Sequence, residues 1–383
     1  MTCSGKNAFT ERPIAIAFAE EIRSVTASAT VPDRYLAPAW IDLQVNGFAG
    51  ADYNDAAATP DEIGRSIRAL HATGVARFFP TVITSAPGAM EAALRNLSRA
   101  RAAIPEGAAI EGFHVEGPHI APADGPRGAH PRAWVRPPNF GEFQRWQDAT
   151  ENRIRIVTLA PEWPEAPNYI ERIVAAGAVA SIGHTEATAA QIADAVSAGA
   201  SLSTHLGNAA HSVLPRFNHI WEQLADDRLM AGFIVDGFHL PAAFLKVALR
   251  AKGADRAILV TDAAAPAGCQ PGRYQLGEVA VDLTPDQRVV LGGGSRLAGS
   301  ALRLDRAIAN VMRTAGTPLG SAAGMATLNP ARAVGISGRQ RGLAPGDRAD
   351  LVVFRVDPNT AALEVDETWL SGRLVYRASP DNE

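Results

Sequence analysis

Polar residues that could do chemistry stand at the ends of short apolar runs throughout the chain. These positions hold Gln44, Asn46, Glu116, His184, His205, Asp236, His239 and Asp262. Two imidazoles and a carboxylate from separate strands make a three-ligand zinc site that leaves one position for water, and Glu116, His184 and His205 fit that pattern. Taken alone, each of the three is equally well explained as a hydrogen-bonded residue of the core or rim. Their shared position at strand ends favours a metal site.

Asp262 and His114 could act beside this metal site. Asp262 ends the apolar run Ile258–Val260, so its carboxylate would lie near the cation and stay ionised by charge attraction. This position suits a general base, whereas the structural alternative is that Asp262 caps the following turn. His114 lies two residues before Glu116 and faces the same side of an extended strand. It is either a fourth ligand or, as we prefer, a group that orients a metal ligand from behind.

The secondary-structure elements that would position these residues alternate regularly along the chain. From about residue 39 onward, apolar runs alternate with Ala-rich helical segments, which is typical of βα units around a parallel sheet. The expected strands are residues 41–46, 75–83, 110–116, 154–160, 179–184, 201–205, 231–236 and 258–262. Thr59 to Glu62 form a capping box, and Gly74, Gly177 and Gly199 stand where helices should end. Eight units predict an α/β fold, a (β/α)8 TIM barrel with its reacting groups at the carboxyl ends of the strands.

Both ends of the chain carry short β-prone runs without intervening helices. We therefore expect a small β-sandwich domain built from residues 1–38 and 340–383, beside a barrel of residues 39–339. Within the barrel, the Pro-rich stretch 117–138 is too long for a plain connection and indicates a structured active-site loop. Residues 271–294 predict a β-hairpin after the eighth strand.

Composition excludes several classes of partner. The formal net charge is −4, from 36 basic and 40 acidic residues dispersed along the chain, so neither a nucleic acid nor an anionic membrane is indicated as a partner. The two cysteines, Cys3 and Cys269, are far apart and form no CxxC pair, which argues against a disulfide framework or a thiolate metal site. No stretch approaches the roughly 20 apolar residues that span a bilayer. We expect a cytoplasmic protein that acts on a small molecule.

Longer motifs extend these observations over most of the chain. They are PAWIDLQVNG (38–47), GFHVEGPHI (112–120), GAHP (128–131), SIGHTEA (181–187), THLGNAA (204–210), VDGFHL (235–240), LVTDA (259–263), LAGSALRLDRAI (297–308), TLNPARAVGI (327–336) and GLAPGDRADLVVF (342–354). In this order they resemble the N-acetylglucosamine-6-phosphate deacetylases of the amidohydrolase superfamily. The resemblance implies a zinc-dependent enzyme that releases acetate and glucosamine-6-phosphate from N-acetylglucosamine-6-phosphate.

The resemblance implies that Glu116, His184 and His205 bind the metal and that Asp262 handles the proton, which are residues already selected from the strand ends. Many superfamily members carry His-x-His on the first strand and bind two metals, whereas residues 44–46 here read Gln-Val-Asn. Because amide side chains are poor replacements for imidazole as zinc ligands, we expect one divalent ion per chain.

The resemblance also implies a substrate site. Asn208 and Ala209 would hold the sugar phosphate together with Arg216, eleven positions past His205. The rest of the sugar site would be lined by Ala129, His130, Asp236, His239, Leu297, Ala298 and Gly299. The family further implies a homodimer, in which the phosphate arginine can come from the neighbouring subunit. The chain departs from the usual family sequence around Arg216 (HSVLPRFNHIWEQLADD), and Gly207 replaces a bulkier residue.

These departures leave alternatives open. The substrate could be N-acetylgalactosamine-6-phosphate, an unphosphorylated N-acetylamino sugar or an N-acyl-amino acid. A cyclic-amide hydrolase is another alternative, but the fourth strand (IRIVTLAPE) lacks the lysine that dihydroorotase-like members usually need. A catalytically silent barrel scaffold is the last, and the joint presence of Glu116, His184, His205 and Asp262 argues against it.

Overall fold

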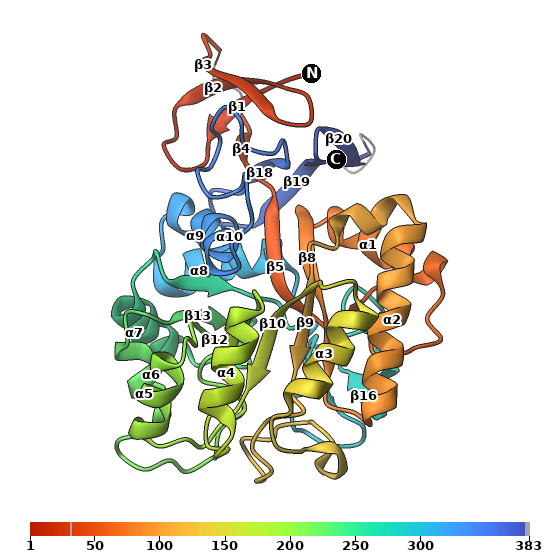
Figure 1. The fold of residues 1–383 in the computed structure, drawn as a ribbon. Coiled ribbons are helices and arrows are strands. Elements are labelled where there is room, and N and C mark those ends of the chain that lie inside the picture. The colour runs from red at the N-terminus through yellow and green to blue at the C-terminus, as the bar shows by residue number, and fades with distance from the viewer. Residues whose placement is uncertain (31–32, 380–383) are drawn as a thin grey trace.

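Eight parallel strands form the central barrel of the computed structural model, which describes residues 1–30 and 33–379 (Figure 1). The strands are β5 (Trp40–Val45), β8 (Val75–Ile83), β9 (Phe113–Glu116), β10 (Ile154–Leu159), β11 (Val179–Ile182), β12 (Leu202–Ser203), β13 (Met230–Phe233) and β14 (Ala257–Leu259). They lie in space in chain order. A parallel bridge between Val45 and Ala263 joins the first strand to the segment after the last. The predicted barrel is confirmed, and each expected run overlaps one of its strands.

Helices cover the outside of the barrel (Figure 1). They are α1 (Pro60–His71), α2 (Pro87–Ala103), α3 (Phe140–Ala149), α4 (Ala166–Ala175), α5 (Ala189–Ser197), α6 (His219–Ala225), α7 (Ala242–Lys252), α8 (Leu304–Ala315), α9 (Leu319–Met325) and α10 (Leu328–Ala333), with short 3-10 helices at Pro105–Ala109 and Arg132–Trp134. The expected capping box opens α1, where Thr59 and Glu62 each accept from the other's backbone N–H. Residues 319–334 form two helices because Pro330 cannot donate to the carbonyl of Ala326.

Burial explains why the barrel strands read as continuous apolar runs. All nine residues of β8 are buried, since one face of a barrel strand meets the helices and the other fills the interior. Polar residues therefore interrupt the pattern where the strands end, which is where the sequence placed the candidate site.

The two ends of the chain meet in one seven-stranded sheet with the order β20-β19-β18-β4-β1-β2-β3. Its strands are β1 (Thr2–Asn7), β2 (Pro13–Phe18), β3 (Ile22–Ala27), β4 (Tyr35–Pro38), β18 (Leu351–Val356), β19 (Leu363–Leu370) and β20 (Arg373–Arg377). All pairs are antiparallel except β1 with β4. Three strands separate β2 from β19, yet the rings of Phe18 and Trp369 lie 5.1 Å apart. The sheet therefore curls over a core of its own, built from both termini as expected. The division into residues 1–38 with 340–383 and residues 39–339 stays a prediction.

A buried ionic cluster joins this sheet to the end of the barrel away from the candidate site. Asp350 Oδ2 accepts from Arg77 Nε and from Arg339 Nη1, both at 2.6 Å. The other oxygen of Asp350 accepts from the backbone N–H of Ser371 at 2.7 Å. Burial alone would raise the pKa of Asp350, but the two guanidinium groups hold it well below its usual range. Every charge here has partners within the protein.

Two excursions from the barrel shape its mouth. Residues 271–294 contain the antiparallel strands β15 (Gly272–Leu276), β16 (Val279–Leu283) and β17 (Val289–Leu291), one strand more than the expected hairpin. A short ribbon of β6 (Gly47–Phe48) and β7 (Ala51–Asp52) follows β5. Among the described residues no helix has both the length and the apolar character needed to cross a bilayer.

Candidate active site

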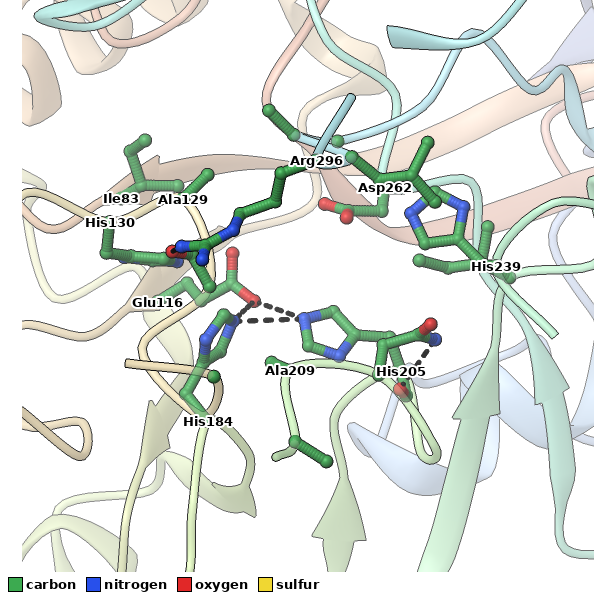
Figure 2. A pocket seen from close by; sticks show the side chains of 18 of the residues that line it. Ile83, Glu116, Ala129, His130, His184, His205, Ala209, His239, Asp262 and Arg296 are labelled. Carbon is green, nitrogen blue, oxygen red and sulfur yellow. Dashed lines mark hydrogen bonds and ion pairs between the residues drawn. The ribbon is translucent and has the colours of Figure 1, made fainter. Parts of the chain in front are cut away.

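The three expected metal ligands converge at the carboxyl ends of β9, β11 and β12 (Figure 2). Nε2 of His205 lies 2.9 Å from Oε1 of Glu116, and Nε2 of His184 lies 3.2 Å from the same oxygen. The two Nε2 atoms are 3.2 Å apart. All three side chains are buried. The barrel thus brings together three residues that are far apart in the sequence and follow different strands.

The backbone at these strand ends is strained. His184 (φ 52°), His205 (φ 27°) and Asp262 (φ 51°) all have the positive φ that side-chain-bearing residues rarely adopt. Such conformations cost on the order of 1–3 kcal/mol each and cluster at functional sites, where the surrounding structure imposes them. Neighbouring strands do so here, as in the hydrogen bond from the backbone N–H of Asp262 to the carbonyl of Gln44 (3.0 Å).

The donor set fits a metal ion. Nδ1 of His184 donates to the carbonyl of Pro126 (3.0 Å), so a neutral His184 ring presents only a lone pair at Nε2. That lone pair faces both a carboxylate oxygen and a second imidazole nitrogen, which is unfavourable unless a cation or a proton lies among them. In tetrahedral zinc sites with bonds of about 2.0–2.2 Å, ligand atoms lie about 3.3–3.6 Å apart. The observed separations, from 2.9 to 3.2 Å, are slightly tighter than this spacing.

The electrostatics of the triad are strongly coupled. Burial acts to raise the pKa of Glu116, but hydrogen bonds and charge from His184 and His205 hold it well below its usual value. Burial acts to lower the pKa of His205, but the Glu116 carboxylate overrides this and raises it. The site therefore keeps an ionised carboxylate in a buried position, which attracts a cation.

Asp262 lies beside the triad and is held by two amides. Asn46 Nδ2 donates to Asp262 Oδ1 at 2.6 Å, and Gln44 Nε2 donates to the same oxygen at 3.0 Å. Gln44 Nε2 also reaches Glu116 Oε1 at 2.8 Å. Burial, followed by the negative charge of Glu116, raises the pKa of Asp262 to about 6. The residues that replace the usual histidines thus position two carboxylates.

His114 does not face the triad with a free nitrogen. Its Nδ1 donates to the carbonyl of Leu43 (3.0 Å), which leaves Nε2 to accept from the Thr158 hydroxyl (2.7 Å). Burial lowers its pKa to about 4, so the ring is neutral. Of the two interpretations of His114, this geometry favours a supporting residue beneath Glu116.

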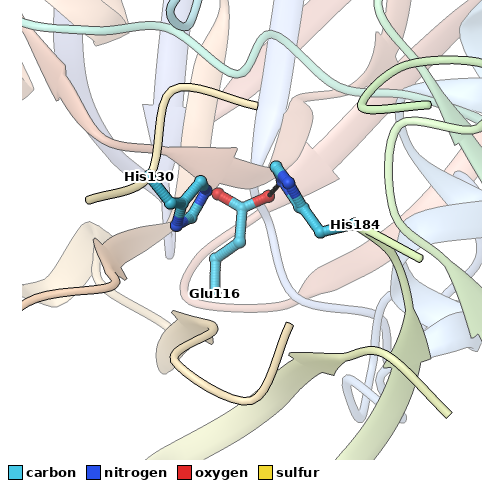
Figure 3. Close-up of side chains that lie close together, drawn as sticks. All are labelled: Glu116, His130 and His184. Atoms are coloured by element: carbon cyan, nitrogen blue, oxygen red, sulfur yellow. Dashed lines mark hydrogen bonds and ion pairs between the residues drawn. The ribbon is translucent and has the colours of Figure 1, made fainter. Parts of the chain in front are cut away.

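Two further histidines border the triad. The ring of His130 packs edge-on against that of His184, with centroids 4.4 Å apart, and together with Glu116 they form a cluster that could hold a metal ion (Figure 3). His130 Nδ1 contacts the Thr84 hydroxyl (2.7 Å), so either tautomer is possible, and burial lowers its pKa to about 3. His239 Nδ1 donates to Asp236 Oδ2 (2.6 Å), which leaves Nε2 as an acceptor.

A cavity of about 520 Å³ opens in front of these groups. Its walls include most of the predicted substrate residues, namely Ala129, His130, Asn208, Ala209, His239, Leu297, Ala298 and Gly299. Two predicted residues do not line it. Asp236 lies behind His239 and orients its ring, and Arg216 lies on an exposed segment outside this cavity. Their predicted contacts with substrate stay predictions.

Comparisons with known proteins agree with this geometry. The model of the amidohydrolase family matches residues 35–375. The chain is 34% identical over 333 residues to the N-acetylglucosamine-6-phosphate deacetylase of Bacillus subtilis, covering 85% of this chain and 82% of that protein. It is 32% identical to the N-acetylgalactosamine-6-phosphate deacetylase of Escherichia coli O157:H7, covering 92% and 91%.

A solved structure is similar over nearly the whole chain. It is a mutant of the N-acetyl-D-glucosamine-6-phosphate deacetylase of Mycobacterium smegmatis in complex with N-acetyl-D-glucosamine-6-phosphate. Its TM-score is 0.87 at 31% identity, covering 98% of this chain and 99% of that one. The chain belongs to the amidohydrolase family. Within it, the chain belongs with the N-acetylglucosamine-6-phosphate deacetylases, as its motifs indicated.

The structure accounts for one departure from the family pattern. Gly207 has φ 95°, and a Cβ placed there would lie 2.7 Å from the Phe244 ring and 2.9 Å from Leu240. A bulkier residue is excluded because Phe244 already fills that space.

Sequence reasoning missed four polar residues of the cavity wall: Asp124, His211, Ser212 and Arg296. His211 pairs with Glu186 at 2.6 Å, and it had no assignable role because nothing local marked its partner. The available signal for Arg296 was its place directly before the predicted segment Leu297 to Gly299.

Proposed function

We propose that this amidohydrolase removes the acetyl group from N-acetylglucosamine-6-phosphate, giving glucosamine-6-phosphate and acetate. One observation carries the proposal: the three convergent donors and the carboxylate of Asp262 face the same cavity. The similarity to deacetylases over more than 80% of the chain supports the choice of substrate.

Glu116, His184 and His205 would hold one divalent ion, and their mixed nitrogen and oxygen donors suit zinc. When bound, such an ion supplies Lewis acidity toward the acetamide carbonyl and lowers the pKa of a water molecule. Gln44 and Asn46 direct amide N–H groups at carboxylates. This supports the expectation of a single ion in each chain.

Asp262 is the proton carrier of the proposed reaction. As a carboxylate it accepts the proton of the attacking water, and as the acid it returns that proton to the leaving amine. Burial raises the pKa of Asp262 to about 6 in the metal-free site, and a bound cation would lower it, so the carboxylate is ionised at neutral pH and can accept the proton. The amides of Gln44 and Asn46 keep one of its oxygens fixed.

The two histidines at the cavity wall have different roles. When Thr84 donates to His130 Nδ1, the Nε2–H of His130 is free to donate to the acetamide carbonyl oxygen as negative charge develops there. His239, with its proton committed to Asp236, accepts a hydrogen bond from a sugar hydroxyl.

We further propose that the protein is a homodimer and that the subunit interface contributes to phosphate binding. Arg216 of the partner subunit would approach the phosphate in a homodimer. Val213 and Phe217 flank Arg216 with exposed fractions of 84% and 80%, and such apolar side chains are typical of a protein contact. The cytoplasmic location stays a prediction.

Acetate release from a substrate panel tests the proposal. N-acetylglucosamine-6-phosphate should have the highest kcat/KM, above N-acetylgalactosamine-6-phosphate, unphosphorylated N-acetylglucosamine and an N-acetyl-amino acid. A higher kcat/KM for any of the other three would assign that substrate to the enzyme instead. Release from none of them by zinc-loaded protein would favour the silent scaffold.

A further inference from the structure

The catalytic cavity contains one side-chain cation that the proposed reaction does not use. Among the described residues lining it, Arg296 is the single arginine or lysine. Arg296 follows Gly292, Gly293 and Gly294 in the loop after β17, and its side chain runs over the cavity toward Ala129 and His130 (Figure 2). Its position makes it accessible to a substrate.

The guanidinium group of Arg296 is nearly unpartnered. Its one hydrogen bond to a described residue runs from Nη1 to the carbonyl of Gly128 at 3.4 Å, the long end of the normal range. Asp124 is the acidic residue on this part of the wall, and it is engaged by Arg127. Arg296 adds to the positive charge that lowers the pKa of Asp124 without forming an ion pair with it. Most of the N–H donors of Arg296 are therefore free to bind a ligand.

The contact with Gly128 places the guanidinium near the turn that follows His205. A Cβ at Gly128 would lie 3.3 Å from the His184 ring and 3.8 Å from Cβ of Ala209. Ala209 has φ 49°, and the backbone N–H groups of Ala209 and Ala210 have no acceptor among the described residues. Successive free N–H groups in such a turn form a concavity that binds anions.

We propose that Arg296 binds the phosphate monoester of the substrate from within the same chain, together with the N–H of Ala210 and with that of Ala209, the position that the family resemblance already assigns to the phosphate. This assignment rests on the proposed deacetylase function and adds to it the residue that sets specificity for an anionic sugar. The planar guanidinium donates two parallel hydrogen bonds to phosphate oxygens, and the turn serves the remaining oxygen. Each subunit then carries an arginine for the phosphate that does not depend on its partner.

The test compares phosphorylated and unphosphorylated substrates. Arg296→Ala should lower kcat/KM for acetate release from N-acetylglucosamine-6-phosphate by roughly 10- to 100-fold, the value of a hydrogen-bonded charge contact. The same variant should change kcat/KM for unphosphorylated N-acetylglucosamine by less than about threefold. Arg296→Lys should recover part of the loss, because it restores the charge without the fork. Arg288→Ala is the matched control, since Arg288 lies in the same excursion and outside this cavity.

Direct binding separates this proposal from the proposed reaction. Calorimetry with D-glucose 6-phosphate, which has no acetamide, should show binding to the zinc-loaded protein and at least tenfold weaker binding to Arg296→Ala. Failure of acetate release with this binding pattern intact would overturn the deacetylase function alone. Equal losses on both sugars, or a loss confined to Arg216→Ala, would overturn the role of Arg296. A loss confined to a carboxylate substrate such as an N-acetyl-amino acid would overturn its assignment to phosphate.

Discussion

Buried charges gather at both ends of the barrel, and the two groups are built differently. At the end next to the terminal sheet, Asp350 lies between Arg77 and Arg339, and opposite charges satisfy one another. At the other end, two imidazole nitrogens converge on one oxygen of Glu116, and two of the side chains around it stand on strained backbone. The first arrangement is complete within the protein, whereas the second becomes favourable when a cation enters. A buried ionic cluster therefore indicates a functional site when its own partners leave it unsatisfied.

Metal removal should have the largest effect on activity, and it should act only on the end of the barrel that holds Glu116, His184 and His205. A chelator should abolish acetate release and lower Tm, because an ion that binds the folded state stabilises it. Metal analysis of the purified protein should give about one divalent ion per chain, and added zinc should restore activity. Two ions per chain, with Gln44 or Asn46 coordinating one, would contradict the single-ion site.

Replacing the proposed base comes next. Asp262→Asn keeps the shape of the side chain but removes the proton acceptor, so turnover should fall by roughly 10²- to 10⁴-fold while metal content is unchanged. Steady-state kinetics alongside metal analysis measure both. Near wild-type turnover would mean that another group carries the proton.

The opposite end should respond in stability and not in chemistry. Asp350→Ala leaves Arg339 buried without its carboxylate and should lower the free energy of unfolding by about 3–5 kcal/mol. Urea unfolding measures this, and kcat per folded molecule should change little. Asp286→Ala removes the exposed pair with Arg288 and should leave the free energy of unfolding nearly unchanged. A loss of turnover in folded Asp350→Ala would show that the two ends are coupled.

The smallest predicted effect is that of pH. Burial raises the pKa of Asp262 to about 6 in the metal-free protein, and a bound cation would lower it. Because Asp262 must be ionised to accept a proton, kcat/KM should level off at neutral pH and fall by up to about tenfold per unit on the acid side, with the break at or below pH 6. The folded pKa also exceeds the unfolded value of about 3.9, so its contribution to stability is present below pH 3.9 and is lost as the pH rises through 6. Asp262→Asn should remove that loss. If the stability of the metal-free protein had the same pH dependence in wild type and Asp262→Asn, the raised pKa would be contradicted.

Most of the barrel could be predicted because the hydrophobic pattern of a segment and the residues that cap or end it are local properties of the sequence. β8 is apolar throughout, and Thr59 with Glu62 marks the start of α1. The strand ends then indicated Glu116, His184, His205 and Asp262, because parallel strands deliver their last residues to one edge. Misses fell where local pattern is weak, such as the third strand of the 271–294 excursion and the loop residue His211.

The sequence by itself determined the order of strands and helices and the kinds of side chain that stand at the strand ends. Only the tertiary structure decided what those side chains do. It turned both nitrogens of His114 into the barrel interior, directed Gln44 and Asn46 at Asp262, placed Arg216 outside the cavity and laid Arg296 across it. The physical reason is that alternation along a strand is set by neighbours in the chain. The direction of a hydrogen bond and the reach of a loop depend on groups that the chain brings together from far apart.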